Sequence, residues 1–196
     1  MARRRGDRFH LVVYKLMWQS WAWPSLFILI GSIAAWALAP GSAYIPSGYR
    51  PLLLIPGLGA LILLSYAYLA QHLAWVQCRG KHIRIQTPIY PLAVSYARIR
   101  SVRPSTLAQV LDMENASGLT RAWLKPYWGR TVVVVYLSSY PFNRTWLRLW
   151  FSPYVLTPGA PGFVFLVEDW MALSRQIDDF QNQWAMRRKG DSRRAA

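Results

Sequence analysis

Two long stretches without a charged residue constrain the fold of this chain most strongly. Residues 21–39 and 52–70 each run for 19 residues without Asp, Glu, Lys or Arg. As helices rising about 1.5 Å per residue, each would be about 28 Å long, close to the roughly 30 Å hydrocarbon core of a bilayer. The segment between them is short and rich in Pro and Gly. We therefore expect an antiparallel pair of transmembrane helices over about 21–39 and 52–71.

The flanks of the two stretches predict an orientation. Trp18, Trp21 and Trp23 surround the start of the first stretch and are expected at the headgroup level, where aromatic side chains concentrate. Lys and Arg lie before the first stretch and after the second, whereas Arg50 alone lies between them. The positive-inside rule then places both termini of this multi-pass protein in the cytoplasm. A cleaved signal peptide is the alternative, since "ALA" at 37–39 is typical of a cleavage site, but Pro40 and the second stretch favour an uncleaved anchor.

Charge and cysteine content narrow the classes of partner and site. Lys and Arg number 23 against 8 Asp and Glu, a net charge of +15. Such an excess suits an acidic protein, anionic lipid or nucleic acid, although cytoplasmic flanks of membrane proteins carry the same bias. Cys78 is the only cysteine, which excludes an internal disulfide and any cysteine-based metal cluster.

From residue 73 onward the hydrophobic period changes from helical to alternating. This alternation predicts seven strands, at about 73–78, 81–87, 91–96, 99–103, 130–137, 145–151 and 162–167. An apolar stripe of Trp170, Leu173, Ile177, Phe180 and Trp184 then predicts a C-terminal amphipathic helix. We expect four parts: a basic cytoplasmic or interfacial N-terminus (1–20), the two spans (21–71), a cytoplasmic domain (73–187) and a basic, irregular tail (188–196).

Four strands, three strands and a final helix resemble the pleckstrin-homology-like (PH-like) fold. The stretch "WVQCRGKHIRIQTPIYPLAVSYARIRSV" at 75–102 is similar to the strand–turn–strand region of bacterial membrane proteins in which a two-helix hairpin precedes such a domain. "GFVFLVEDWMALSRQIDDF" at 162–180 resembles their last strand and helix. The resemblance implies a mainly-β barrel or sandwich of seven strands capped by a C-terminal helix. It also implies a binding module and not an enzyme.

If the strands form a simple meander, successive turns alternate between the two ends of the domain. Three aromatic-rich turns then fall near the membrane, at 87–91, 104–129 and 152–161. The first contains Tyr90, and the second contains Trp123, Tyr127 and Trp128. The turns at the far end are basic. Arg79 and Lys81 lie in the turn at 79–81, Arg98 in the turn at 97–98 and Arg144 in the turn at 138–144. We expect these basic turns to face a partner and the aromatic turns to face the bilayer interface.

The polar residues form no recognisable catalytic constellation. His72, at the end of the second span, is a candidate contact for a haem or pigment, but no second ligand accompanies it. Asp178 and Asp179 are adjacent on a helix and so do not face each other. No Gly-rich phosphate loop or nucleophile elbow occurs. We expect no enzymatic activity, no metal, no cofactor and no nucleic-acid partner.

Two functions remain open. The first is a membrane-anchored, non-enzymatic scaffold that presents a cytoplasmic PH-like domain to a protein partner, with anionic lipid as an additional ligand. The second is an accessory structural subunit of a larger respiratory or photosynthetic membrane complex, because 11 Trp and 11 Tyr supply ample surface for lateral packing. Copurification with cofactor-bearing subunits distinguishes the second function from the first.

Overall fold

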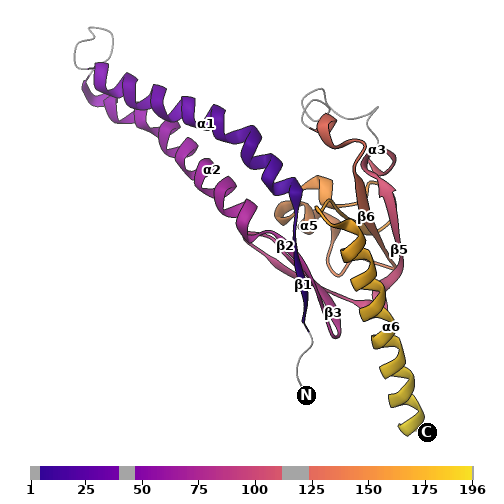
Figure 1. Ribbon diagram of the computed structural model, residues 1–196. Coiled ribbons are helices and arrows are strands. Elements are labelled where there is room, and N and C mark those ends of the chain that lie inside the picture. The colour runs from indigo at the N-terminus through magenta and orange to yellow at the C-terminus, as the bar shows by residue number, and fades with distance from the viewer. Residues whose placement is uncertain (1–4, 40–46, 112–123, 196) are drawn as a thin grey trace. The chain divides into compact units, whose positions relative to one another are not determined.

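The computed structural model describes residues 5–39, 47–111 and 124–195, which form two compact units (Figure 1). The hairpin unit comprises Tyr14–His72. The sheet unit comprises the residues up to Val13 and those from Leu73 onward. The sheet unit is therefore built from two chain segments, and the hairpin unit lies between them in the sequence.

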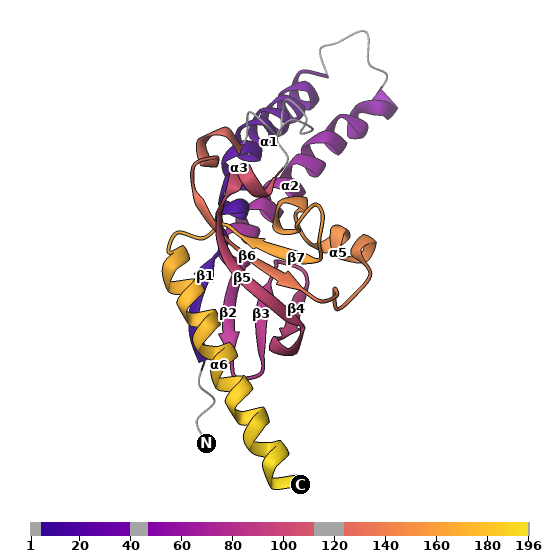
Figure 2. The same cartoon turned by 90° about the vertical axis from the view of Figure 1, so that its right-hand side faces the viewer.

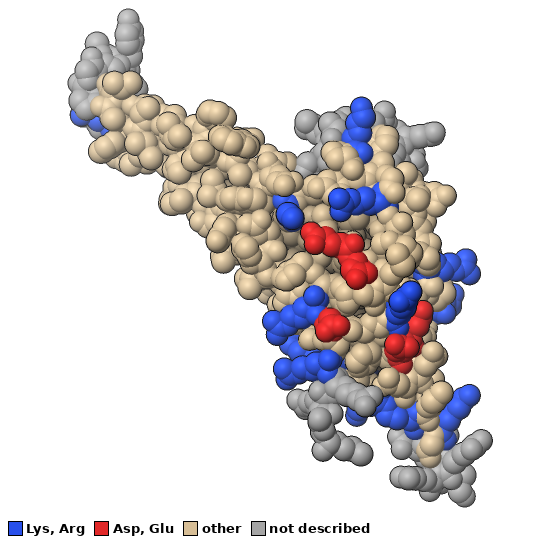
Figure 3. All heavy atoms as spheres, viewed as in Figure 1, with Lys and Arg blue, Asp and Glu red and all other residues tan. Residues whose placement is uncertain are grey.

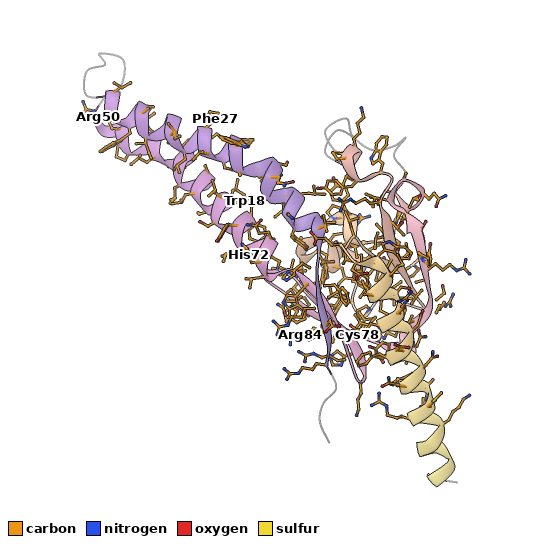
Figure 4. The ribbon with its side chains drawn as sticks, in the orientation of Figure 1. Trp18, Phe27, Arg50, His72, Cys78 and Arg84 are labelled. Carbon is orange, nitrogen blue, oxygen red and sulfur yellow. The ribbon has the colours of Figure 1, made fainter. Side chains whose placement is uncertain are left out.

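The hairpin unit consists of helices α1 (Val12–Leu38) and α2 (Leu54–Leu73), with a 3₁₀ helix, η2 (Ser47–Leu53), leading into α2. Both helices are long and apolar enough to cross a membrane, as the sequence predicted, although α1 begins earlier than expected. The pairing is antiparallel, because Trp18 near the start of α1 contacts Tyr68 near the end of α2, at 5.5 Å between ring centroids. Many apolar side chains, Phe27 among them, point away from the partner helix (Figure 4).

Seven antiparallel strands form two sheets in the sheet unit (Figure 2). The first sheet has the order β1 (Arg5–His10), β2 (Trp75–Arg79), β3 (His82–Gln86) and β4 (Pro91–Ser95). The second has the order β5 (Ile99–Thr106), β6 (Thr131–Leu137) and β7 (Gly162–Phe165). Within the described ranges no strand pairing joins the two sheets, so they do not close into a barrel.

The number of strands agrees with the prediction, but two assignments were wrong. The expected strand at 145–151 is a helix, α5 (Arg144–Trp150), whose N-cap is Asn143 with its side-chain oxygen accepting from Thr145 N at 3.2 Å. Strand β1 was missed, because the segment RGDRFH is polar and was assigned to an interfacial N-terminus. As an edge strand it obtains its order from backbone pairing with β2 and needs little apolar surface.

Helix α6 (Trp170–Ala195) packs against β2, β5 and β6. Leu173, Ile177 and Phe180 are buried, which confirms the central part of the predicted stripe. The carboxylate of Asp169 caps the helix by accepting from Ala172 N at 2.9 Å. The helix continues through residues that the sequence analysis assigned to an irregular tail, since only Gly190 there disfavours helix.

The first sheet has two distinct ends, fixed by its register. At the junction end, His10 pairs with Trp75, Trp75 with Gln86, and Gln86 with Pro91. The chain leaves for α1 and returns from α2 here, where Leu11 N donates to Ala74 O at 3.2 Å. At the opposite end, which we call the basic end, Arg5 pairs with Arg79, and His82 pairs with Ser95.

Candidate basic interface

Basic side chains from three elements meet at the basic end. Arg5 begins β1, Arg79 ends β2, and Lys81 lies in the β2–β3 turn. Arg187 of α6 joins them, because its guanidinium donates to Gly80 O in that turn at 3.2 Å. Basic side chains gather around this end of the sheet unit in Figure 3. Lys81 and Arg187 are exposed, so the cluster can meet an anionic surface.

The sequence analysis named two of these four residues. Arg79 and Lys81 were expected in a basic turn, whereas Arg5 was assigned to the N-terminal segment and Arg187 only marked the end of the predicted domain. The polar β1 and the long reach of α6 bring the other two to the turn. The hydrogen-bonded pairing of β1 with β2 is the feature that the sequence did not reveal.

Arg98 and Arg144, the other two predicted partner-facing residues, make hydrogen bonds within the sheet unit. Arg98 lies on η3 (Tyr96–Arg98), next to the basic end, and its Nη1 donates to Tyr140 O at 3.1 Å. Arg144 starts α5, and its Nη2 donates to Thr157 O at 3.0 Å and to Pro158 O at 2.7 Å. Arg144 therefore stabilises the loop after α5 and is not part of the basic cluster.

The alternation of turns fails over 138–161. Leu137 N donates to Pro161 O at 2.8 Å, so the segment leaves β6 and returns to β7 at the same end of the second sheet. The expected far turn at 138–144 and the expected near turn at 152–161 are thus parts of one excursion. The physical reason is that α5 replaces the strand that would have separated them.

Burial and the arginines near the basic end lower the pKa of the neighbouring His82. Burial lowers the pKa of His82, and the positive charges of Arg79 and Arg84 lower it further. Arg84 projects from the first sheet (Figure 4), and its guanidinium lies over the Trp75 ring at 5.5 Å, together with that of Arg8 at 4.8 Å. His82 is therefore neutral at neutral pH and adds nothing to the positive charge of this end.

Beneath the cluster lies a buried thiol. Cys78 is fully buried, and burial raises its pKa to about 12, although the neighbouring Tyr96 side chain acts in the opposite direction. Burial likewise raises the pKa of Tyr96, with a further contribution from Cys78. Both groups are protonated at neutral pH, so the cluster rests on an uncharged core (Figure 4).

A polar groove of about 400 Å³ lies between β1 and α6. Arg5 and Arg175 line it, as do the carboxylates of Asp7 and Asp179. The side chain of Gln176 crosses it by donating to the Asp7 carboxylate at 3.2 Å. Because opposite charges are balanced here, the groove has no preference for an anion, and the adjacent cluster is the more distinctive surface.

The predicted interface aromatics fall into both units. In the hairpin unit Trp21 and Trp23 are exposed, and Trp18 is half-buried against Tyr68. In the sheet unit Tyr90 lies in the β3–β4 turn, at the junction end. Tyr127 and Trp128 are half-buried at η4 (Lys125–Tyr127), where Ala108 N donates to Trp128 O at 3.3 Å. Trp123 lies outside the described residues.

His72, the candidate cofactor contact, lies on the last turn of α2 (Figure 4). Its ring contacts Tyr68 at 5.0 Å between centroids, and a ring nitrogen lies 3.3 Å from the Gln71 side-chain nitrogen. Within the part of the chain that the structure describes, no three His, Cys, Asp or Glu residues lie close enough to hold a metal ion.

Comparison with protein-family models, with curated proteins and with solved structures finds no match for this chain.

Proposed function

We propose that this protein is a membrane-anchored binding protein whose basic end holds an acidic protein partner. The observation that carries the proposal is the convergence of Arg5, Arg79, Lys81 and Arg187 from β1, the β2–β3 turn and α6. Arg5, Arg79 and Arg187 lie on regular secondary structure. Lys81 lies in the short β2–β3 turn, and Arg187 is held to that turn by its hydrogen bond to Gly80 O. A preorganised cluster of one sign attracts an oppositely charged partner and accelerates its association.

The topology supports membrane anchoring by two crossings. β1 precedes α1, and β2 follows α2, yet the two strands are hydrogen-bonded neighbours. The chain before α1 and the chain after α2 must therefore lie on the same side of any membrane. One crossing by each helix meets this requirement and fits the length and apolarity of both.

The charge distribution supports the cytoplasmic face of a bacterial inner membrane. Most of the 23 Lys and Arg belong to the segments before α1 and after α2. Such segments stay in the cytoplasm under the positive-inside rule. The four-plus-three strands followed by α6 support the resemblance to a PH-like domain, a fold that implies binding and not catalysis.

The basic end lies at the opposite end of the first sheet from the strand ends that connect to α1 and α2. β2 runs from Trp75 at the junction end to Arg79 at the basic end, about 13 Å at roughly 3.3 Å per residue. Anionic lipid can add to binding elsewhere on the domain, where each basic residue near a bilayer surface contributes about 1 kcal/mol.

The test is site-specific photocrosslinking of the full chain in native membranes. A photoreactive amino acid replaces Lys81 in one variant and Arg103, an exposed arginine in the middle of β5, in the control. We expect one acidic protein to be crosslinked from position 81 and not from position 103, with a yield that falls as ionic strength rises. Equal products from both positions, or none from position 81, would contradict the proposal.

Charge reversal provides the second arm of the same test. Arg187→Glu should reduce the crosslinking from position 81 by at least tenfold. Arg103→Glu makes the same change in net charge outside the cluster and should leave the yield unchanged. If the product at position 81 belongs to a stoichiometric, cofactor-bearing membrane complex, the accessory-subunit function replaces that of a scaffold.

A further inference from the structure

An exposed aromatic patch forms around α5 and the β3–β4 turn. The ring of Tyr90 contacts Phe142 at 6.3 Å and stacks on Trp150 at 6.1 Å, and Trp150 contacts Trp146 at 5.7 Å. Ile89 (57% exposed), Phe142 (47%), Trp146 (44%) and Leu149 (69%) present large apolar surfaces to solvent. The aromatic patch therefore consists of Ile89, Tyr90, Phe142, Trp146, Leu149 and Trp150.

The α5 helix is built to expose its apolar side chains. Of its seven residues only Leu147 is buried, while Trp146 and Leu149 lie on the surface with Arg148 between them. Asn143 caps its start, and the hydrogen bonds of Arg144 to Thr157 O and Pro158 O fix its orientation. The exposure of Trp146 and Leu149 thus belongs to a well-anchored element.

The patch lies at the junction end of the first sheet. Tyr90 directly precedes Pro91, which pairs with Gln86, and Gln86 pairs with Trp75, the first residue of β2. Since adjacent strands are about 4.8 Å apart, Pro91 is about 10 Å across the sheet from Trp75. Only Ala74 separates Trp75 from the last residue of α2. A bilayer that contains α2 therefore has its surface within reach of the patch.

The charges around the patch suit an anionic bilayer surface. Residues 115–167, which include α5 and its flanking loops, contain no Asp or Glu and five Arg or Lys. Trp and Tyr beside Arg are the composition of the headgroup region, where the rings bury their apolar parts and the polar atoms stay hydrated. Arg148, next to Leu149 and exposed on the same helix, can meet lipid phosphates.

We propose that the aromatic patch inserts into the headgroup region of the same bilayer that α1 and α2 span. The sheet unit is then attached to the membrane in two ways. The chain connects it to α1 and α2, and the aromatic patch contacts the lipid headgroups directly. Two independent contacts limit the tilt of the domain on the membrane. The inference rests on membrane insertion of the hairpin and does not depend on the acidic partner.

The experiment uses the full chain in nanodiscs of phosphatidylcholine and phosphatidylglycerol that hold one copy each. A bimane fluorophore is attached at Leu149→Cys in one sample and at Lys81→Cys, in the β2–β3 turn, in the other. The unsubstituted chain serves as the labelling blank, since Cys78 is buried. Bimane quenching is measured with lipids brominated on their acyl chains and, separately, with aqueous iodide.

We expect brominated lipid to quench the label at position 149 at least threefold more than the label at position 81, and iodide to show the reverse. Trp146→Ser should reduce the lipid quenching at position 149, whereas Met171→Ser, a change of an exposed residue on α6, should not. Equal iodide quenching at positions 149 and 81 would overturn the proposal. Shielding of position 149 that appears only with two copies per disc would also overturn it, in favour of self-association.

Discussion

Ser32 on α1 lies directly against Gly57 on α2, with the Ser32 hydroxyl oxygen accepting a hydrogen bond from Gly57 N at 3.1 Å. The same hydroxyl donates to Leu53 O, so one side chain joins the start of α2 to the middle of α1. A Cβ at Gly57 would lie 2.9 Å from that hydroxyl oxygen and 3.0 Å from the Ser32 Cβ. Gly31 and Ala35, whose small side chains have the spacing typical of close helix contacts, are both exposed.

Gly57→Val should therefore destabilise the hairpin, by about 1–3 kcal/mol as for other overpacked sites. Gly59→Val is the matched control, because a Cβ at Gly59 has no neighbour within 4 Å. Thermal unfolding of both variants in the same detergent measures the difference. Equal midpoints for the two variants would show that the contact between Ser32 and Gly57 is not part of the native packing.

Leu173→Ala should reduce the free energy of unfolding by about 2–5 kcal/mol, because the side chain is fully buried where α6 packs on the sheets. Met171→Ala, two residues away on the exposed side, should change it by less than about 0.5 kcal/mol. Denaturant titration followed by circular dichroism measures both variants. Similar losses would mean that α6 presents a different face to the sheets.

Cys78 should resist alkylation at pH 8, because burial raises its pKa to about 12 and removes it from solvent. Maleimide should therefore react with the thiol only after the sheet unit unfolds, and its reaction rate should rise steeply across the denaturation midpoint. Mass spectrometry of the native and denatured protein counts the adduct. Rapid labelling without denaturant would contradict the position of Cys78 in the core.

Because of His82, the free energy of unfolding should decrease as the pH falls from 7 to 5. Burial and the nearby arginines lower its pKa in the folded state, so the unfolded chain binds the proton more readily as the pH falls. Stability contributed by neutral His82 is present above the unfolded pKa of about 6.5 and is lost as the pH falls below it. His82→Gln should weaken this loss between pH 7 and pH 5. An unchanged pH profile of the unfolding midpoint would contradict the assignment.

Arg144→Gln should loosen the loop at 152–161, because Thr157 O and Pro158 O lose a charged donor worth about 1.5–3 kcal/mol. Limited proteolysis should cut that loop faster in the variant. Arg103→Gln, at an exposed site in β5, is the control and should leave the cleavage rate unchanged. Unaltered cleavage in Arg144→Gln would restore Arg144 as a candidate for the partner surface.

Elements with strong apolar patterns were predictable from the sequence. The stripe of Leu173, Ile177 and Phe180 identified α6, and the run of valines at 132–135 identified β6, which lies between two neighbours and is buried along its length. The two apolar helices were equally clear. In each case burial over several residues leaves a periodic pattern.

Elements held mainly by hydrogen bonds were not predictable from the same pattern. In RTWLRLW, the spacing of the apolar residues fits both the period of a strand and the period of a helix. The residue that indicates a helix is Asn143, which caps its start. The aromatic patch was missed because this segment was read as a strand, which placed Phe142 and Tyr90 at opposite ends of the domain. Of the basic cluster, Arg79 and Lys81 were expected, while Arg5 required knowledge of a pairing between distant segments.

That pairing has a consequence for biogenesis. The ribosome makes β1 some 65 residues before its neighbour β2, with the long apolar helices α1 and α2 in between. At about 5–20 residues per second, β1 waits roughly 3–13 s for a strand to join. A hydrophobic strand exposed for that time would invite aggregation or capture by the insertion machinery. The polarity of RGDRFH, which left no apolar pattern to predict a strand from, keeps the unpaired segment soluble until α1 and α2 have been made and β2 becomes available for pairing.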